Sequence, residues 1–237
     1  MSFFERENKL KAVTFSFDDG VTQDLRLIYL LDKYGLKCTF NINSDLLGKR
    51  GLLKRPSGQV VSHYKIYPEE LCNLYTNHEI AAHTLTHPRL PELDDADVIK
   101  QVEQDRINLS KIVGYDVVGL AYPCGGKNFD DRVKNLIKNN TGIKYCRTII
   151  STNKFDMPED LYAINPTMAH IADFENAMKL AKEFVESKPD KPQVFYIWGH
   201  SYEMDIESDR WVKLEELFKF ISNRDDIFYG TNKEVFL

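Results

Sequence analysis

Short apolar runs alternate along the chain with longer stretches in which apolar residues recur every three or four positions. The first pattern is typical of strands and the second of amphipathic helices. In residues 12–17, Val13, Phe15 and Phe17 alternate with smaller residues, which predicts a strand packed on one face. Strands are predicted at residues 12–17, 37–42, 79–82, 116–122, 143–149, 161–164, 193–198 and 227–229.

Helical patterns fill most of the segments between these strands. Thr22 is predicted to cap the first helix and Gly35 to end it. The inner face of this helix is predicted to carry Leu25, Ile28, Leu31 and Tyr34. Residues 43–66 contain three glycines and a proline and are interpreted as a long surface loop. Helices are predicted at residues 22–35, 68–75, 94–114, 130–139, 173–187 and 211–221.

Strands that alternate with helices pair mostly in parallel, because each crossover helix returns the chain to the same edge of the sheet. Seven or eight such units favour an α/β barrel over an open sheet. No repeat or linker divides the sequence, so residues 1–237 are predicted to form a single domain. Polar clusters follow several of the strands, on the face where β/α barrels carry their chemistry. These clusters are Asp18-Asp19, residues 83–87, Pro123-Cys124, Arg147 and Gly199-His200.

Composition narrows the classes of partner. The 237 residues are 43% hydrophobic and 28% charged, as in ordinary soluble proteins. A net charge of -5 without a long basic run makes nucleic acid an unexpected partner, and no apolar run is long enough for a membrane span. The four cysteines form no CxxC pair and no signal peptide is visible, which predicts reduced thiols and a cytoplasmic location for a complete chain.

His83 and His87 are the first candidate metal ligands. On one helical turn a spacing of four places both imidazoles on the same side, where they can share an ion. Asp19 is a candidate third ligand, and Asp18 beside it suits a proton acceptor. Each pattern has a simpler interpretation, because Asp-Asp-Gly also forms ordinary turns and HxxxH recurs by chance.

The sequence resembles the polysaccharide deacetylases, the NodB-homology group of carbohydrate esterases (family 4). The resemblance implies a distorted, TIM-like (β/α) barrel of seven or eight strands. It rests on four motifs in order: Phe17-Asp18-Asp19-Gly20, His83-Thr84-Leu85-Thr86-His87, Tyr122-Pro123-Cys124-Gly125 and Gly199-His200.

The resemblance also implies an activity, the removal of N-acetyl groups from a saccharide. A divalent metal, with zinc expected and cobalt or nickel as alternatives, would be held by Asp19, His83 and His87. Asp18 matches the general base of the family and His200 its general acid. The backbone N–H of Cys124 matches the position that stabilises the oxyanion. The expected partner is an acetylated saccharide, and the oligomeric state is open.

Two departures from the family pattern affect this expectation. Ala121 replaces an arginine that steadies the base in many members, and Cys124 replaces an aromatic residue, which suggests a differently shaped substrate wall. Arg147, at the end of the next strand, is the candidate substitute and is predicted to lie within roughly 3 Å of Asp18. The alternative is a surface arginine.

Other functions remain open from sequence alone. The same scaffold could be an O-acetyl esterase, an amidase for a small amide, or a catalytically impaired carbohydrate-binding homologue. Retention of both an acid and a base argues against binding alone. Trp198 and Trp211 are interpreted as core more readily than as sugar-stacking surfaces, and His63 and His78 as loop histidines. His170 is interpreted as a solvated histidine more readily than as one that reaches the site from a loop, and Glu203 as an orienting partner of His200 or a solvated residue.

Overall fold

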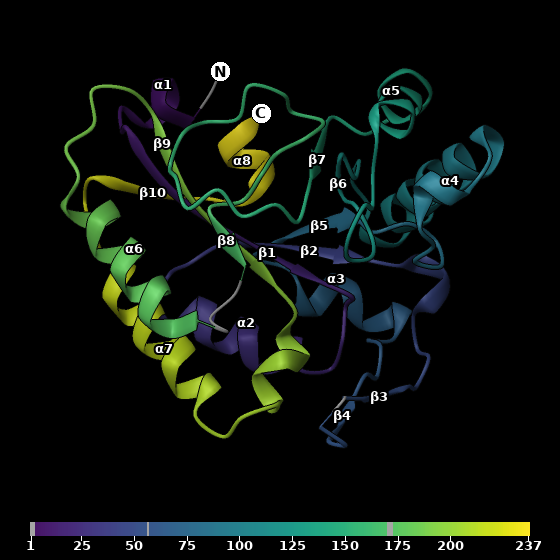
Figure 1. The fold of residues 1–237 in the computed structure, drawn as a ribbon, viewed down its shortest axis with the longest axis horizontal. Coiled ribbons are helices and arrows are strands. Elements are labelled where there is room, and N and C mark those ends of the chain that lie inside the picture. Colours follow the sequence, from purple (N-terminus) through teal and green to yellow (C-terminus); the bar gives the residue numbers. More distant parts are fainter. Residues whose placement is uncertain (1–2, 56, 170–172) are drawn as a thin grey trace.

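The computed structural model describes residues 3–55, 57–169 and 173–237, so His170 lies outside the described residues. Figure 1 shows a central sheet with helices around it. The strands are β1 (Lys11–Asp18), β2 (Cys38–Ile42), β3 (Leu52–Lys54), β4 (Val60–Ser62), β5 (Glu79–Ala82), β6 (Gly119–Ala121), β7 (Tyr145–Arg147), β8 (Met168–Ala169), β9 (Gln193–Gly199) and β10 (Ile227–Tyr229). The helices are α1 (Phe3–Glu7), α2 (Asp24–Lys33), α3 (Leu71–Leu74), α4 (Asp95–Val113), α5 (Asp131–Asn140), α6 (Phe174–Glu186), α7 (Arg210–Ile221) and α8 (Asn232–Phe236), with 3-10 turns η1 (Ser44–Leu46), η2 (Pro68–Glu70), η3 (Leu90–Glu92) and η5 (Ser201–Asp205).

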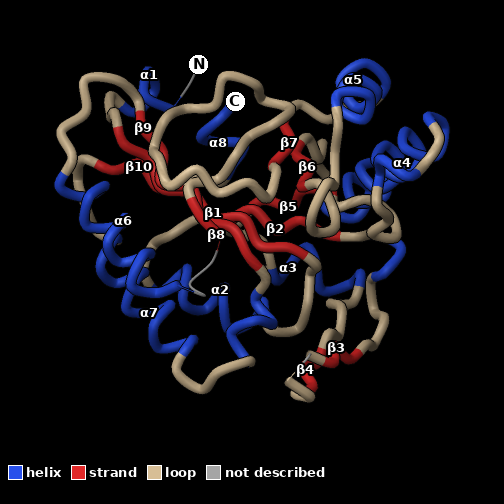
Figure 2. Tube along the Cα trace, in the orientation of Figure 1, coloured by secondary structure: helices blue, strands red, loops and turns tan. Residues whose placement is uncertain are grey.

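The large sheet has the strand order β7-β6-β5-β2-β1-β9-β8, and β10 also pairs with β1. All of its recorded pairs are parallel. In Figure 2 the strands of this sheet lie across the middle of the molecule, with α4 and α5 on one side and α6 and α7 on the other. The architecture is therefore a distorted (β/α) barrel, as the sequence predicts.

Strand β1 lies at the centre of this sheet and is buried on both faces. All eight of its residues are buried, whereas the alternation of Val13, Phe15 and Phe17 predicted one buried face. The prediction was wrong because a central parallel strand is covered by helices on one face and by barrel core on the other. Small and hydroxyl residues at the intervening positions fit the crowded interior.

Helix ends follow the sequence signals unevenly. The carboxylate of Asp94 accepts from the backbone N–H of Asp97, and Gly114 ends α4 with φ 77°, at the two ends of the predicted helix 94–114. Helix α2 instead begins at Asp24, and Thr22 does not cap it. Ile28 and Leu31 are buried as predicted, but Leu25 is 55% exposed, because Leu27 and Leu30 complete the buried face of the helix in its place.

Two segments differ in type from the sequence prediction. Residues 43–66 are not only loop, since they contain η1 and the antiparallel hairpin of β3 and β4, which projects from the barrel in Figure 1. Residues 161–164 form no strand; Ile164 makes only an isolated bridge to Arg147. The strand in this region is β8, and β6 and β7 are shorter than predicted.

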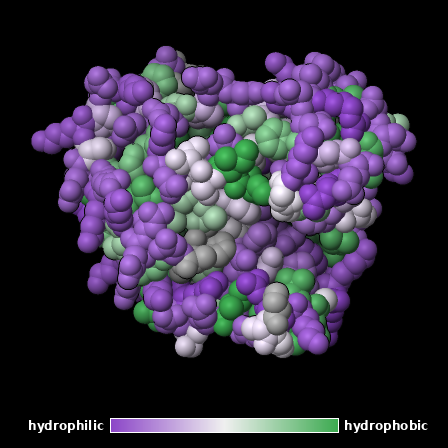
Figure 3. All heavy atoms as spheres, viewed as in Figure 1, coloured by the Kyte–Doolittle hydropathy of each residue, from purple (hydrophilic) through white to green (hydrophobic). Residues whose placement is uncertain are grey.

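The surface on the side seen in Figure 3 is mainly hydrophilic, with hydrophobic residues in small separate groups. Leu52 and Val60, both on the hairpin, are among the exposed large hydrophobic residues. Within residues 3–55, 57–169 and 173–237, no helix combines the length and the apolar character that crossing a bilayer requires.

Candidate active site

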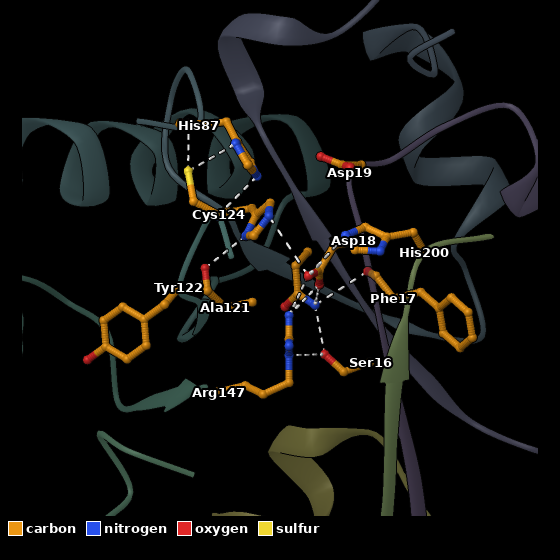
Figure 4. A network of polar contacts seen from close by, with 12 residues as sticks. Ser16, Phe17, Asp18, Asp19, His87, Ala121, Tyr122, Cys124, Arg147 and His200 are labelled. Carbon is orange, nitrogen blue, oxygen red and sulfur yellow. Dashed lines mark hydrogen bonds and ion pairs between the residues drawn. The ribbon is translucent and has the colours of Figure 1, made fainter. Parts of the chain in front are cut away.

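The predicted site residues come from the carboxyl ends of parallel strands. Asp18 is the last residue of β1 and Asp19 follows it with a positive φ of 84°. His83 follows β5, Arg147 ends β7 and His200 follows β9. Because parallel strands share a direction, these ends meet at one edge of the barrel. Figure 4 shows Arg147 reaching Asp18, with His200 beside that carboxylate.

Arg147 is fully buried, and each end of its guanidinium is held. Nη2 donates to Oδ1 and Oδ2 of Asp18 at 2.6 and 2.5 Å, so the predicted contact is present. Nε donates to Ser16 Oγ at 3.1 Å and Nη1 to the carbonyl of Thr148 at 3.2 Å. Both bonds to Asp18 come from one nitrogen, because the other two nitrogens of the guanidinium have these partners. The ring of Trp198 lies 4.5 Å from the guanidinium carbon and completes the enclosure.

Asp18 lies in a polar but buried setting. Asn41 Nδ2 donates to its Oδ1 at 2.8 Å, and Oδ2 lies 3.9 Å from His83 Nε2 and 4.0 Å from His200 Nε2. Burial by itself raises the pKa of Asp18, but the charge of Arg147 together with the nearby imidazoles of His83 and His200 outweighs it, and the net pKa is lowered. Asp18 is therefore an ionised carboxylate with one oxygen facing two imidazoles, a suitable proton acceptor.

His83 presents an unpaired nitrogen to the site. Its Nδ1 lies 2.8 Å from the carbonyl oxygen of Ala121, and because a carbonyl only accepts, Nδ1 carries the proton. Nε2 is buried without a hydrogen-bond partner. Burial lowers the pKa of His83 to about 4, so the ring is neutral. A neutral imidazole whose other N–H is anchored to a carbonyl is the usual state of a metal-binding histidine.

His83 and His87 do not share a helical turn, which corrects the sequence-based expectation. Residues 83–87 form a loop in which Thr84 and His87 have positive φ values of 69° and 63°. The two rings still approach, with centroids 4.8 Å apart. The loop therefore brings the histidines together by backbone turns, not by helical periodicity.

The expected metal ligands form one compact group. One donor atom each from Asp19, His83 and His87 lies within 4.8 Å of the others. Two imidazoles and one carboxylate are a donor set that zinc and similar ions accept, with positions left for water. A bound ion would give the buried Nε2 of His83 the partner that it lacks, so the residues fit a divalent metal.

Two further side chains contact Asp19, and sequence reasoning missed both. His63 Nε2 lies 3.2 Å from Oδ2, although it was interpreted as a loop histidine. Lys65 Nζ donates to Oδ1 at 3.1 Å and to the backbone carbonyl of Asp19 at 2.7 Å. Burial raises the pKa of Asp19, but His63 and Lys65 outweigh it, and the net pKa is well below the ordinary value. Both residues follow the hairpin, where the sequence carries no motif.

His200 has a carboxylate behind it. Its Nδ1 lies 3.2 Å from Oε2 of Glu203, and its Nε2 faces Asp18. Burial lowers the pKa of His200, but the hydrogen bond with Glu203 and the charge of Asp18 prevail and raise it. The imidazolium form is thus favoured, as a proton donor requires. Of the two interpretations of Glu203, orientation of His200 agrees with this geometry.

The loop of Cys124 borders His87. Cys124 has a φ of 71°, and its backbone N lies 3.5 Å from His87 Nε2. Asn128 Nδ2 donates to the carbonyls of Tyr122 and Cys124 at 3.1 and 3.0 Å, which holds the loop. Burial raises the pKa of the Cys124 thiol, so it is no thiolate nucleophile.

A second set of buried polar groups supports the histidine loop. Asp105 on α4 accepts from the backbone N–H of His83 at 2.9 Å, and Asn43 Nδ2 donates to the carbonyls of His83 and Thr84. Neither residue belongs to a sequence motif. Trp211 is 5% exposed and packs in the core, as interpreted.

Solved structures share this fold at low identity. A search of curated proteins found no match. The deacetylase PplD of Streptococcus pyogenes, solved with acetate, is 17% identical with a TM-score of 0.56, covering 70% of this chain and 68% of that one. The Xyl-CE4 domain of a xylanase from the hindgut metagenome of Trinervitermes trinervoides is 15% identical with a TM-score of 0.59, covering 96% and 89%. A mutant of a CE4 family pseudoenzyme from Bacillus anthracis, with restored enzymatic activity, is 15% identical with a TM-score of 0.60, covering 98% and 69%.

These likenesses concern the fold, and they agree with the NodB-type barrel that the motifs predict. Family membership rests on the sequence. The family model described as polysaccharide deacetylase matches residues 5–146, which is more than half of the chain and includes the first three motifs. The chain belongs to the polysaccharide deacetylase family.

Proposed function

We propose that this protein is a metal-dependent hydrolase that removes N-acetyl groups from a saccharide. The observation that carries the proposal is the unpaired Nε2 of buried His83, which lies in one group with donors from Asp19 and His87 and 3.9 Å from Asp18. A base, a metal-ligand set and a proton donor thus meet at one barrel edge.

Asp19, His83 and His87 would hold the divalent ion, with zinc expected and cobalt or nickel as alternatives. Such an ion acidifies a bound water molecule and polarises the acetyl carbonyl. The N–H of His83 on the carbonyl of Ala121 fixes which nitrogen faces the ion.

Asp18 acts as the general base in this proposal. Its carboxylate accepts a proton from the water that attacks the acetyl carbon. Arg147 keeps the carboxylate ionised and prevents it from swinging toward the ion, because Nη2 contacts both oxygens. Arg147 thereby replaces the charge that Ala121 lacks.

Cys124 and His200 complete the reaction on the substrate side. The backbone N–H of Cys124, which faces His87, donates to the oxyanion as the carbonyl becomes tetrahedral. His200 gives its proton to the sugar nitrogen, and the C–N bond then breaks to release the amine and acetate. An amine is a poor leaving group until protonated, which is why a charged imidazole favours an amide substrate.

Acetate release tests the proposal. N-acetylated and O-acetylated oligosaccharides and small acetamides are each incubated with the protein as purified, after chelation, and after zinc or cobalt is restored. We expect metal-dependent release from N-acetylated sugars, and loss of roughly 10² to 10⁴ in kcat for Asp18→Asn. Release from esters or small amides alone would assign one of the other hydrolase functions. No release from any substrate with metal restored would favour a carbohydrate-binding homologue.

A further inference from the structure

The two neighbouring carboxylates of the candidate active site, Asp18 and Asp19, already have cationic partners within the chain. Arg147 contacts Asp18, and the ammonium of Lys65 contacts both the carboxylate and the backbone carbonyl of Asp19. The side chains of Lys65 and Asp19 are only 5% and 9% exposed. Solvent therefore screens this ion pair little, and a buried pair of this kind is costly to break.

The backbone around Lys65 is held in place. Lys65 forms an antiparallel bridge with Val21, and its N–H donates to the carbonyl of Lys49 at 2.9 Å. The N–H of Ile66 donates to the carbonyl of Gly20 at 2.9 Å. These bonds tie the segment after the hairpin to the exit of β1. The ammonium is consequently fixed beside Asp19, unlike that of a mobile surface lysine.

The charges at the site balance before any ion binds. Asp18 pairs with Arg147 and Asp19 with Lys65, so two negative charges face two positive ones, and His200 has its own carboxylate partner in Glu203. A divalent ion must therefore share the carboxylate of Asp19 with a fixed ammonium, and like charges held close together in a buried site repel.

We propose that Lys65 is a positioning residue that neutralises Asp19 in the metal-free protein and weakens the binding of a divalent ion. This inference rests on the proposed metal site. Lys65 holds the carboxylate in place while the ion is absent and opposes its charge when it binds. Metal binding is then a reversible exchange of two cations at the Asp19 carboxylate, in which Lys65 loses most of its favourable interaction with Asp19.

Calorimetric titration of the chelated protein with zinc or cobalt tests the proposal. Lys65→Met removes the charge, Lys65→Gln keeps a donor for the Asp19 carbonyl, and Lys65→Arg keeps the charge. Lys11→Met is the matched control, because Lys11 is also buried but bonds to carbonyls of α6 and its following residue, outside the site. We expect a dissociation constant at least about tenfold lower in Lys65→Met and Lys65→Gln, and near-parental values in Lys65→Arg and Lys11→Met.

Thermal unfolding gives an independent readout. Without metal, Lys65→Met should melt below the parent, and added metal should raise its melting temperature more than that of the parent. Unchanged or weaker metal binding in Lys65→Met and Lys65→Gln, with normal binding by the parent, would overturn this inference alone. Absence of metal binding in the parent and every variant would overturn the proposed metal site as well. If Lys65→Met folds only when metal is present, the proposal is supported.

Discussion

Nη2 of Arg147 lies 2.6 Å from Oδ1 and 2.5 Å from Oδ2 of Asp18, which joins the carboxyl ends of β7 and β1. The contact is buried, with side-chain exposures of 1% and 3%. It places a fixed cation at the base although Ala121, two residues before Pro123, has no charge to offer. The charge and the orientation of Asp18 therefore both depend on Arg147.

Arg147→Met should impair stability and catalysis together. It leaves a buried carboxylate unpaired, which costs roughly 3–5 kcal/mol in the free energy of unfolding. We expect kcat and kcat/KM to fall together by about 10² or more with metal content unchanged, the signature of a lost transition-state interaction. Urea unfolding and steady-state kinetics measure both.

Two comparisons sharpen this prediction. The double variant Asp18→Asn/Arg147→Met removes both charges and should recover much of the stability while staying inactive. Arg132→Met is the control, because Arg132 is 38% exposed and pairs with exposed Asp95, an ion pair worth about 1 kcal/mol or less. Parental turnover in Arg147→Met would show that another group holds Asp18.

Replacement of either metal-site histidine should remove bound metal. His83→Ala and His87→Ala each leave two donors, which hold zinc weakly. Elemental analysis of purified, dialysed protein is expected to show most of the metal lost. His78→Gln is the control, since His78 is a buried histidine that packs on Phe40 outside the ligand group. Full metal occupancy in both alanine variants would contradict the ligand assignment.

Glu203→Gln should shift the pH dependence of activity. Glu203 raises the pKa of His200, so its neutralisation lowers that pKa. The protonated donor is then lost at lower pH, and the basic limb of the pH–rate profile should move to lower pH while metal content stays constant. His200→Ala should abolish that limb. If the profile of Glu203→Gln superimposes on that of the parent, Glu203 is not the residue that raises the pKa of His200.

The fold was predictable where local signals and tertiary contacts agree. Asp94 and Gly114 marked the ends of α4, and residues 227–229 were placed correctly as a strand, because capping and apolar runs act locally. The one-sided burial of β1 was wrong because the number of layers around a strand is decided by distant segments. The β3–β4 hairpin was missed because its strands have only three residues each.

The candidate site also contains residues that the sequence could predict and residues that it could not. Asp18, Asp19 and His83 lie at or just past strand ends, so topology alone brought them together in the prediction. Arg147 was predicted because Ala121 lacks the charge of the arginine that many family members have at that position. Lys65 could not be found, because its approach to Asp19 depends on the pairing of Lys65 with Val21, two segments far apart in the sequence, and no local pattern records that.

The pH dependence of stability should reveal the buried carboxyl of Asp24. Burial raises its pKa from the ordinary value of 3.8 to about 7, against the opposing effect of hydrogen bonds from Ser201 and Tyr75. Between about pH 4 and pH 7 the folded protein keeps a proton that the unfolded chain releases. The free energy of unfolding contributed by this group therefore falls as pH rises through this window, with a limiting slope of about 1.4 kcal/mol per pH unit.

Asp24→Asn removes this contribution because an amide stays neutral, while Ser201 and Tyr75 can still bond to it. Relative to the parent, the variant should gain stability steadily from pH 4 to pH 7 and then stay level. Asp105, whose pKa burial also raises to about 7, should leave a residual slope of the same sign. Urea unfolding with chelator at pH 4 to 8 measures the difference, with exposed Asp156→Asn as the control. Parallel curves for Asp24→Asn and the parent would show that Asp24 is ionised in the folded protein throughout this range.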